Sequence, residues 1–295
     1  MAVALSTVLA ISLSFHSLFA LPTAAWQPTR AKQNDVPNLA PLVAKKRAVL
    51  LVPGLWLHPF QNERCLAPEM HDWQRPYSKL VKELSPDFDV YAFSFAQTVP
   101  LDAVSLSTGM RNQVATLKQA GYREIILIGH SAGGVIARQF VERFPNTGVT
   151  KVIQVASPNR GSDYATISLG IPKPQLPFVK SMLPEFRKVA TIRSPKLPND
   201  LEFCCVVCQG GNRQSDTIVE FDSQWPEDLQ KQGIPAVMVA SYHNESVKAE
   251  IPVKAIGELA REKLVRWSAE DVATAKKVVF QPIRSPSRGL GFVRP

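Results

Sequence analysis

The sequence is poor in cysteine and, beyond its first two dozen residues, has no apolar run long enough to span a membrane. Its four cysteines are Cys65, Cys204, Cys205 and Cys208, and no histidine clusters with the last three. No metal site is therefore expected. Residues 203–208 form an apolar run that predicts a buried strand, with Cys204 and Cys208 on one face and Cys205 on the other. A disulfide from Cys65 to one of these three is left open.

The body of the chain also lacks an excess of either charge. The net charge is +9, but the excess of Lys and Arg falls in residues 30–47 and 276–295, and the part between them is formally neutral. A neutral body excludes a basic groove for nucleic acid, so no nucleic-acid partner is predicted. The basic ends favour solvated tails, and peripheral contact with an anionic surface is the alternative.

The first 25 residues carry no charged side chain, and residues 3–21 are mostly apolar. Small residues at 23–25 suit a signal peptidase, so residues 1–25 are predicted to be a secretory signal and residues 26–46 a linker. The expected location is secreted or periplasmic. The Ala25–Trp26 step followed by Arg30 and Lys32 also fits a bipartite plastid pre-sequence, which is the alternative.

Apolar runs and helical spacings alternate from residue 48 to residue 267. Strands are expected at 48–52, 89–95, 125–128, 149–156, 203–208 and 236–240, with helices at 74–84, 106–120, 135–144, 225–232 and 253–267. This alternation predicts one α/β domain, a mostly parallel sheet with helices on both faces, and a basic tail at 268–295. Residues 163–200 interrupt it with six prolines among apolar residues. We interpret them as a cap insertion that lines an acyl pocket; a surface insertion packing on itself is the alternative.

The segment 124–134, EIILIGHSAGG, combines a buried strand, a G-x-S-x-G turn and the start of a helix. This is the context in which the pattern forms a nucleophile elbow. Glycines two residues before and after Ser131 avoid side chains that would crowd the adjoining strand and helix. The turn exposes the Ser131 hydroxyl and directs the Ala132 N–H to the place where an oxyanion would form.

A serine hydroxyl needs a base and a carboxylate that orients the base. Of the five histidines, only His243 follows a late strand at the sheet edge where Ser131 must emerge. Asp216 is the preferred carboxylate because it lies closest to the end of the preceding strand. The competing acids are Asp163, Glu220, Asp222 and Asp228. Leu55 N–H, after Pro53 and Gly54, is the expected second oxyanion donor.

The segments LVPGL, IGHSAGGVIAR, VASPNRGSD, SDTIVE and YHNES together resemble the lipase and esterase branch of the α/β-hydrolase fold, over residues 48–267. The resemblance implies hydrolysis of carboxylic esters through an acyl-enzyme, with no metal or organic cofactor. It implies that Ser131, Asp216 and His243 are catalytic and that a small-molecule or lipid ester is the partner. Substrate contacts are expected from Trp56, His130, Phe178 and Met182.

Three residues depart from the pattern of this family. Pro53 replaces the usual histidine before Gly54, Asn159 stands where many lipases have histidine, and Thr217 replaces the glycine after the acid. None of them removes a reacting group. An amidase, thioesterase or acyltransferase would use the same groups, and a catalytically silent binding module of this fold is the alternative outside the enzymes. The sequence leaves the oligomeric state open.

Overall fold

Seven strands form one sheet in the computed structural model, which describes residues 25–28, 46–166, 170–193, 195–211 and 214–281. The strands are β1 (Ala25–Pro28), β2 (Arg47–Val52), β3 (Asp89–Ser94), β4 (Glu124–His130), β5 (Lys151–Val155), β6 (Glu202–Gln209) and β7 (Ala236–Ala240). They lie in the order β1-β3-β2-β4-β5-β6-β7, and all neighbours are parallel except β1 and β3. The predicted α/β fold with a mostly parallel sheet is confirmed.

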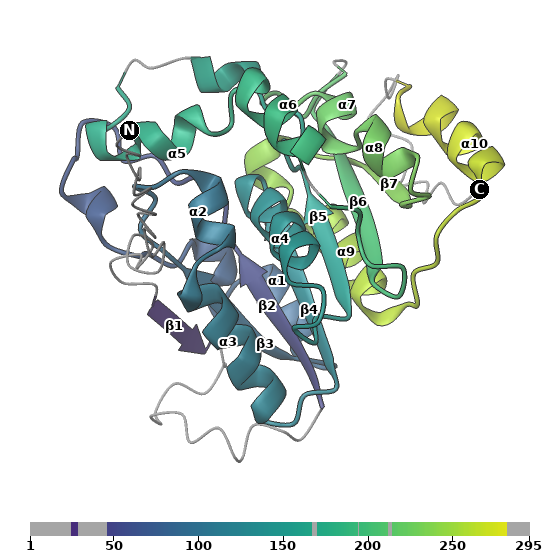
Figure 1. The fold of residues 1–295 in the computed structure, drawn as a ribbon, viewed down its shortest axis with the longest axis horizontal. Helices are drawn as coiled ribbons and strands as arrows, with labels where there is room; N and C mark the ends of the chain where they lie inside the picture. Colours follow the sequence, from purple (N-terminus) through teal and green to yellow (C-terminus); the bar gives the residue numbers. More distant parts are fainter. Residues whose placement is uncertain (1–24, 29–45, 167–169, 194, 212–213, 282–295) are drawn as a thin grey trace, which may run out of the picture.

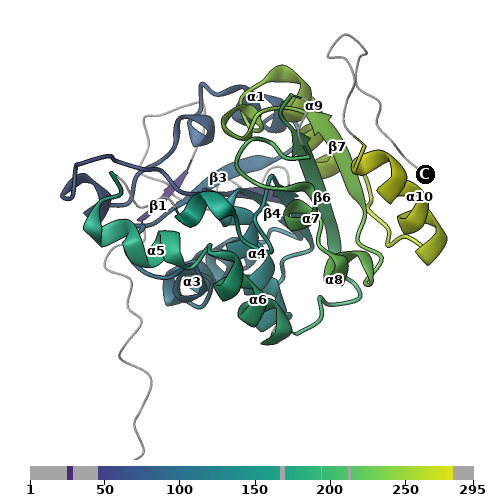
Figure 2. The ribbon, with the colours of Figure 1, turned by 90° about the horizontal axis from the view of Figure 1, so that it is seen from above.

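Two apolar clusters cover the two faces of this sheet. In β4, Ile125 and Leu127 belong to one cluster, while Ile126 and Ile128 belong to the other, as the alternation of side chains along a strand requires. The first cluster includes side chains of α3 (Thr108–Gln119) and α4 (Ala132–Arg143), and the second includes side chains of α1 (Lys79–Leu84) and α9 (Glu250–Arg261). Figures 1 and 2 show these helices on opposite sides of the strands.

The described part of the insertion between β5 and β6 contains four short helical elements. They are η4 (Asp163–Thr166), η5 (Lys173–Gln175), α5 (Leu176–Lys180) and α6 (Pro184–Arg193). Figure 1 shows α5 and α6 above the sheet, next to α2 (Leu101–Ser105) and α4. The insertion therefore lies near the carboxyl ends of the strands, where loops from several strands converge.

Several expected helices have different bounds. The predicted helix 74–84 is divided into η3 (Asp72–Gln74) and α1. The predicted helix 106–120 is confirmed as α3, and α2 is a separate short helix that precedes it. The predicted helix at 225–232 is present as the shorter α8 (Glu227–Gln230), and a further one-turn helix, α7 (Phe221–Gln224), precedes it. Two further short 3-10 helices are η2 (Arg64–Leu66) and η6 (His243–Glu245). Helix α9 begins three residues before the expected start at 253 and ends at Arg261.

The segment 268–295, predicted as a tail, begins with a packed helix instead. Helix α10 (Ala269–Val279) starts at a capping box in which Ser268 and Asp271 bond reciprocally. Ala275 and Val279 are fully buried in the same cluster as α3 and α4. The prediction of a tail is wrong for residues 269–279, because Lys276 and Lys277 lie on the exposed face of a helix whose other face is apolar and buried. The predicted signal and linker lie outside the described residues, apart from Ala25–Pro28 and Lys46.

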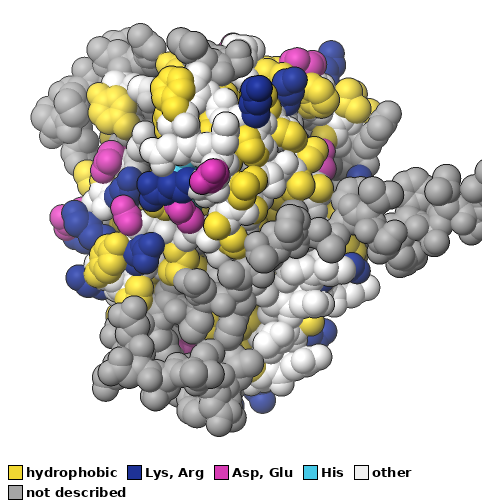
Figure 3. Space-filling model, turned by 90° about the vertical axis from the view of Figure 1, so that its left-hand side faces the viewer, with side chains coloured by type: hydrophobic (Ala, Val, Ile, Leu, Met, Phe, Trp, Pro, Cys, Tyr) yellow, Lys and Arg dark blue, Asp and Glu magenta, His cyan; other side chains and the backbone are white. Residues whose placement is uncertain are grey.

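All four cysteines are buried and free, so none forms the disulfide left open above. Cys205 faces one cluster while Cys204 and Cys208 face the other, as predicted. None of the helices in the described ranges is long and apolar enough to cross a membrane. Figure 3 shows one face on which acidic and basic side chains are intermixed among apolar ones.

Candidate active site

Ser131 lies at a sharp turn between β4 and α4. Its backbone has φ 55° and ψ −130°, a conformation that is strained for a residue with a side chain. The turn is held by a 2.8 Å hydrogen bond from the Ser131 N–H to the Val155 carbonyl of β5. A Cβ added to Gly133 would lie 2.1 Å from the Val52 carbonyl oxygen, so only glycine allows helix and strand this close.

The structure brings Ser131, His243 and Asp216 together at the carboxyl edge of the sheet. His243 Nε2 lies 3.0 Å from Ser131 Oγ, and His243 Nδ1 lies 2.7 Å from Asp216 Oδ2. The three side chains are buried, with exposed fractions of 8%, 5% and 0%. Because the carboxylate accepts from Nδ1–H, Nε2 is the nitrogen that can accept the serine proton. This arrangement can activate a serine hydroxyl as a nucleophile.

The loop around Asp216 fixes both its carboxylate and its backbone by hydrogen bonds. Asp216 Oδ1 accepts hydrogen bonds from the backbone N–H groups of Ile218 at 2.9 Å and Val219 at 2.8 Å. The Asp216 carbonyl accepts from the His243 N–H at 2.9 Å. These bonds align the carboxylate with the imidazole without any contribution from the competing acids. Asp222 and Asp228 instead pair with Arg160 and Arg138.

His130, predicted to contact substrate, lines the cavity but is also tied to the loop of His243. Its Nε2–H donates to the His243 carbonyl at 3.1 Å, and its ring packs against the His243 ring at 5.0 Å between centroids. Burial, together with the nearby His243, lowers the pKa of His130 well below the ordinary value. His130 is therefore an uncharged donor that orients the backbone of His243.

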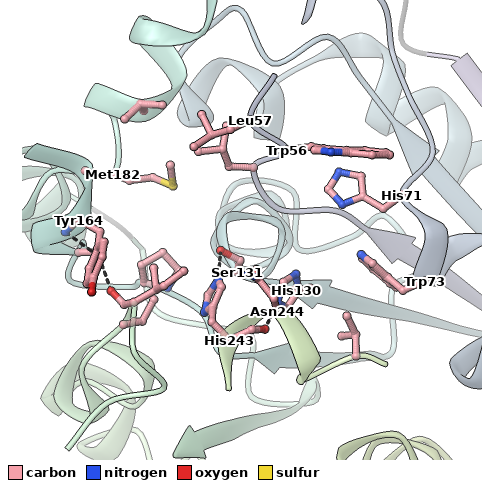
Figure 4. A pocket seen from close by; sticks show the side chains of 18 of the residues that line it. Trp56, Leu57, His71, Trp73, His130, Ser131, Tyr164, Met182, His243 and Asn244 are labelled. Carbon is pink, nitrogen blue, oxygen red and sulfur yellow. Dashed lines mark hydrogen bonds between the residues drawn. The ribbon is translucent and has the colours of Figure 1, made fainter. Parts of the chain in front are cut away.

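A cavity of about 600 Å³ opens above Ser131 (Figure 4). On one side its walls are apolar and come from the loop after β2, from the insertion and from the loop after β6. Representative residues are Leu57, Tyr164, Ala165, Val179, Met182 and Val219. On the other side, Figure 4 shows Trp56, His71 and Trp73. Burial, reinforced by the charge of Lys248, lowers the pKa of His71 to about 3, so this imidazole is uncharged at neutral pH.

The four predicted substrate contacts have different positions. Trp56, His130 and Met182 line the cavity. Phe178 does not: its side chain is fully buried and packs against Phe95, with ring centroids 5.8 Å apart. Its neighbour Val179 lines the cavity instead. Helical α5 turns adjacent residues to different sides, and without its bounds the sequence did not indicate which residue faced inward.

The backbone donors expected at an oxyanion site adjoin Ser131. Ala132 is the first residue of α4, so its N–H is one of the unpaired donors at the helix N-terminus. Leu55 lines the cavity in the loop after β2. Within the described ranges, neither N–H donates a hydrogen bond to a protein acceptor.

Asn159, one of the departures noted above, has a structural position. Its side chain is buried and hydrogen-bonded to Gln154, at 3.0 Å in both directions, and to the Gln224 carbonyl at 3.2 Å. It therefore supports the loop after β5 rather than facing the cavity.

The sequence did not indicate other residues near the site, notably Trp73, His71 and Gln97. Listing the polar residue nearest each strand end would have identified Gln97, three residues after β3.

A model of the family described as the alpha/beta hydrolase family matches residues 49–281. No curated protein matches the chain significantly. Solved structures with a similar fold include a Bacillus licheniformis lipase, BlEst2, in its mature form. It has 14% identity and a TM-score of 0.59, and the match covers 80% of this chain and 98% of that one.

Two further structures are similar at the same low identity. The phospholipase PlaB from Legionella pneumophila has 14% identity and a TM-score of 0.54, covering 79% of this chain and 63% of that one. The metagenomic carboxyl esterase MGS0156 has 14% identity and a TM-score of 0.51, covering 80% of this chain and 76% of that one. At an identity this low, these similarities show that the fold is shared and nothing beyond the fold.

Proposed function

The chain belongs to the alpha/beta hydrolase family, and from this premise we propose that it is a serine hydrolase that cleaves carboxylic esters through an acyl-enzyme. The observation that carries the proposal is the hydrogen-bonded chain from Ser131 through His243 to Asp216, at 3.0 Å and 2.7 Å. Structural neighbours described as a lipase and a carboxyl esterase add to it.

In the proposed reaction, His243 takes the proton of Ser131 as the hydroxyl oxygen attacks the ester carbonyl. Asp216 holds the imidazole in the required tautomer and stabilises its protonated form. The N–H groups of Leu55 and Ala132 stabilise the oxyanion of the tetrahedral intermediate. His243 then protonates the leaving alcohol, and a water molecule activated by the same imidazole hydrolyses the acyl-enzyme. No step in this scheme requires a metal or an organic cofactor.

The apolar side of the cavity supports an ester with a hydrocarbon acyl group as the substrate. Leu57, Val179 and Met182 would remove the chain from water next to Ser131. An amidase, a thioesterase and an acyltransferase would use the same groups. Comparing the hydrolysis of an ester with that of an anilide of the same acid tests the ester assignment, which a faster anilide would contradict.

The proposal is tested with Ser131→Ala and p-nitrophenyl esters. We expect kcat to fall by about 10⁴-fold or more, because the nucleophile is lost while the oxyanion donors remain. Ser241→Ala is a matched control, since Ser131 and Ser241 both have an exposed fraction of 8% and Ser241 lies outside the cavity. Its kcat should stay within about threefold of the unchanged protein.

Labelling with a fluorophosphonate probe separates the enzyme from a silent binding module. An adduct on Ser131 that is absent in Ser131→Ala supports an activated serine. A folded protein that forms no adduct and turns over no ester would establish the silent module instead.

A further inference from the structure

A glutamine side chain is hydrogen-bonded to the backbone of the loop after β2. Gln97 Nε2 donates to the Gly54 carbonyl at 2.6 Å, and Gln97 Oε1 accepts from the Trp56 N–H at 2.7 Å. Gln97 is 7% exposed and does not belong to the lining of the cavity above Ser131. Its amide is thus occupied by the protein backbone rather than turned toward substrate.

A second glutamine, which belongs to the insertion, forms hydrogen bonds with the same loop. Gln175 in η5 is 1% exposed, and its Nε2 donates to the Trp56 carbonyl at 2.8 Å and to Gln97 Oε1 at 3.4 Å. Its Oε1 accepts from the His58 N–H at 3.4 Å. The two amides therefore hold the polar groups of Gly54, Trp56 and His58, much as a neighbouring strand would.

The bond to Gly54 fixes the direction of the Leu55 N–H. In a trans peptide the carbonyl of one residue and the N–H of the next point in opposite directions, and there is no cis peptide in the described chain. With the Gly54 carbonyl directed at Gln97, the Leu55 N–H must point away from Gln97.

Gly54, the first residue of this peptide, lies directly against Ser131. A Cβ added to Gly54 would lie 2.6 Å from Ser131 Cβ and 3.2 Å from Ser131 Oγ. Leu55 lines the same cavity as Ser131. The peptide that joins Gly54 to Leu55 therefore lies beside Ser131, where negative charge would develop during attack by its hydroxyl.

We infer that Gln97 is a positioning residue that holds the Gly54–Leu55 peptide so that the Leu55 N–H points into the oxyanion site, with Gln175 linking this loop to the insertion. The inference rests on the proposed function, since it concerns the transition state of that reaction. Without the Gln97 amide, rotation of this peptide would turn a carbonyl toward the developing negative charge. The sequence did not indicate this role, because only the folded structure shows that the Gln97 amide reaches the Gly54 carbonyl.

The test replaces Gln97 by methionine, which keeps the length of the side chain and removes its amide. We expect kcat to fall about 10- to 100-fold, part of the 10²- to 10³-fold loss for an absent oxyanion donor. KM should change by less than about threefold, because a donor aimed at the oxyanion acts mainly in the transition state. The inhibition constant of an alkylboronic acid, a tetrahedral analogue, should rise together with the loss of kcat/KM.

Gln113→Met is the matched control, because Gln113 is also 7% exposed and lies in α3 away from the cavity. Rates are divided by the concentration of sites that react with a fluorophosphonate, so that partial unfolding does not imitate a loss of kcat. Gln175→Met should lower kcat less than Gln97→Met, because it leaves the bond to Gly54 intact.

Three results would overturn the inference. They are a kcat of Gln97→Met within twofold of the parent, a loss confined to KM, and boronic acid binding that does not weaken. An equal loss in Gln113→Met would likewise show a general effect of removing a buried amide. If the unaltered protein turns over no ester and Ser131 forms no adduct, the proposed function fails instead.

Discussion

At the scale of single residues, two strained backbone conformations lie at the two ends of the hydrogen-bonded chain that runs from Ser131 through His243 to Asp216. Ser131 has φ 55°, and Thr217, directly after Asp216, has φ 87°. Positive φ is unfavourable for a β-branched residue because its side chain crowds the backbone. The resemblance to lipases had indicated glycine at 217, and the structure shows why: the turn that presents the Ile218 and Val219 N–H groups to Asp216 requires this conformation.

Thr217→Gly should therefore stabilise the protein. Relief of a strained residue contributes about 1 to 3 kcal/mol, and the greater freedom of unfolded glycine offsets about 0.5 to 1 kcal/mol of it. We expect a net gain of about 1 kcal/mol in the free energy of unfolding, measured by urea denaturation. Thr116→Gly, within helix α3, is the contrast and should cost about 0.5 kcal/mol. Equal losses at both positions would show that Thr217 is not strained.

At the scale of elements, helix α4 directly follows Ser131 and is held in place by a buried network of ion pairs. Arg138 Nε bonds Glu142 Oε1 at 2.8 Å, and the same guanidinium pairs with Asp228 of α8 and with Asn159 Oδ1 at 3.3 Å. Arg138 and Glu142 are 5% and 4% exposed. The network ties α4 to α8 and to the loop after β5, and so helps to hold the elbow in place.

Removing only the cation should be costly, because Glu142 would remain as an unpaired buried charge. We expect Arg138→Met to lower the free energy of unfolding by about 3 to 5 kcal/mol, whereas the double variant Arg138→Met with Glu142→Met should recover most of this loss. Urea denaturation of the three proteins measures the difference. A double variant less stable than Arg138→Met would mean that Glu142 has another buried partner.

At the scale of the whole molecule, the cavity belongs to no single element. The loops after β2 and β6 supply Leu57 and Val219, and the insertion supplies Ala165, Val179 and Met182. The sheet alone would leave this side of Ser131 open. The chain length accepted by the proposed enzyme therefore depends on how the insertion is packed against the core.

Ala165→Phe should shift the preference of the proposed esterase toward short acyl chains. The added ring would fill part of the apolar side, so kcat/KM for octanoate relative to acetate esters should fall about tenfold. Val189→Phe is the control, since Val189 in α6 is 48% exposed and lies outside this cavity. An unchanged chain-length profile in Ala165→Phe would place the acyl chain elsewhere.

The sequence by itself determined the features that arise from local pattern. The apolar run of β4 followed by glycine, serine and glycine specified strand, turn and helix, since backbone sterics allow few other conformations there. The alternation of strands and helices specified the parallel sheet, and with it the edge at which Ser131, Asp216 and His243 emerge.

Only the tertiary structure decided which distant groups touch. It showed that His243 bonds Asp216 rather than another acid and that Val179 rather than Phe178 lines the cavity. It also placed the Gln97 amide on the Gly54 carbonyl. Such contacts depend on the relative position of whole elements, to within a fraction of a hydrogen-bond length, and spacing along the chain carries no information of that kind.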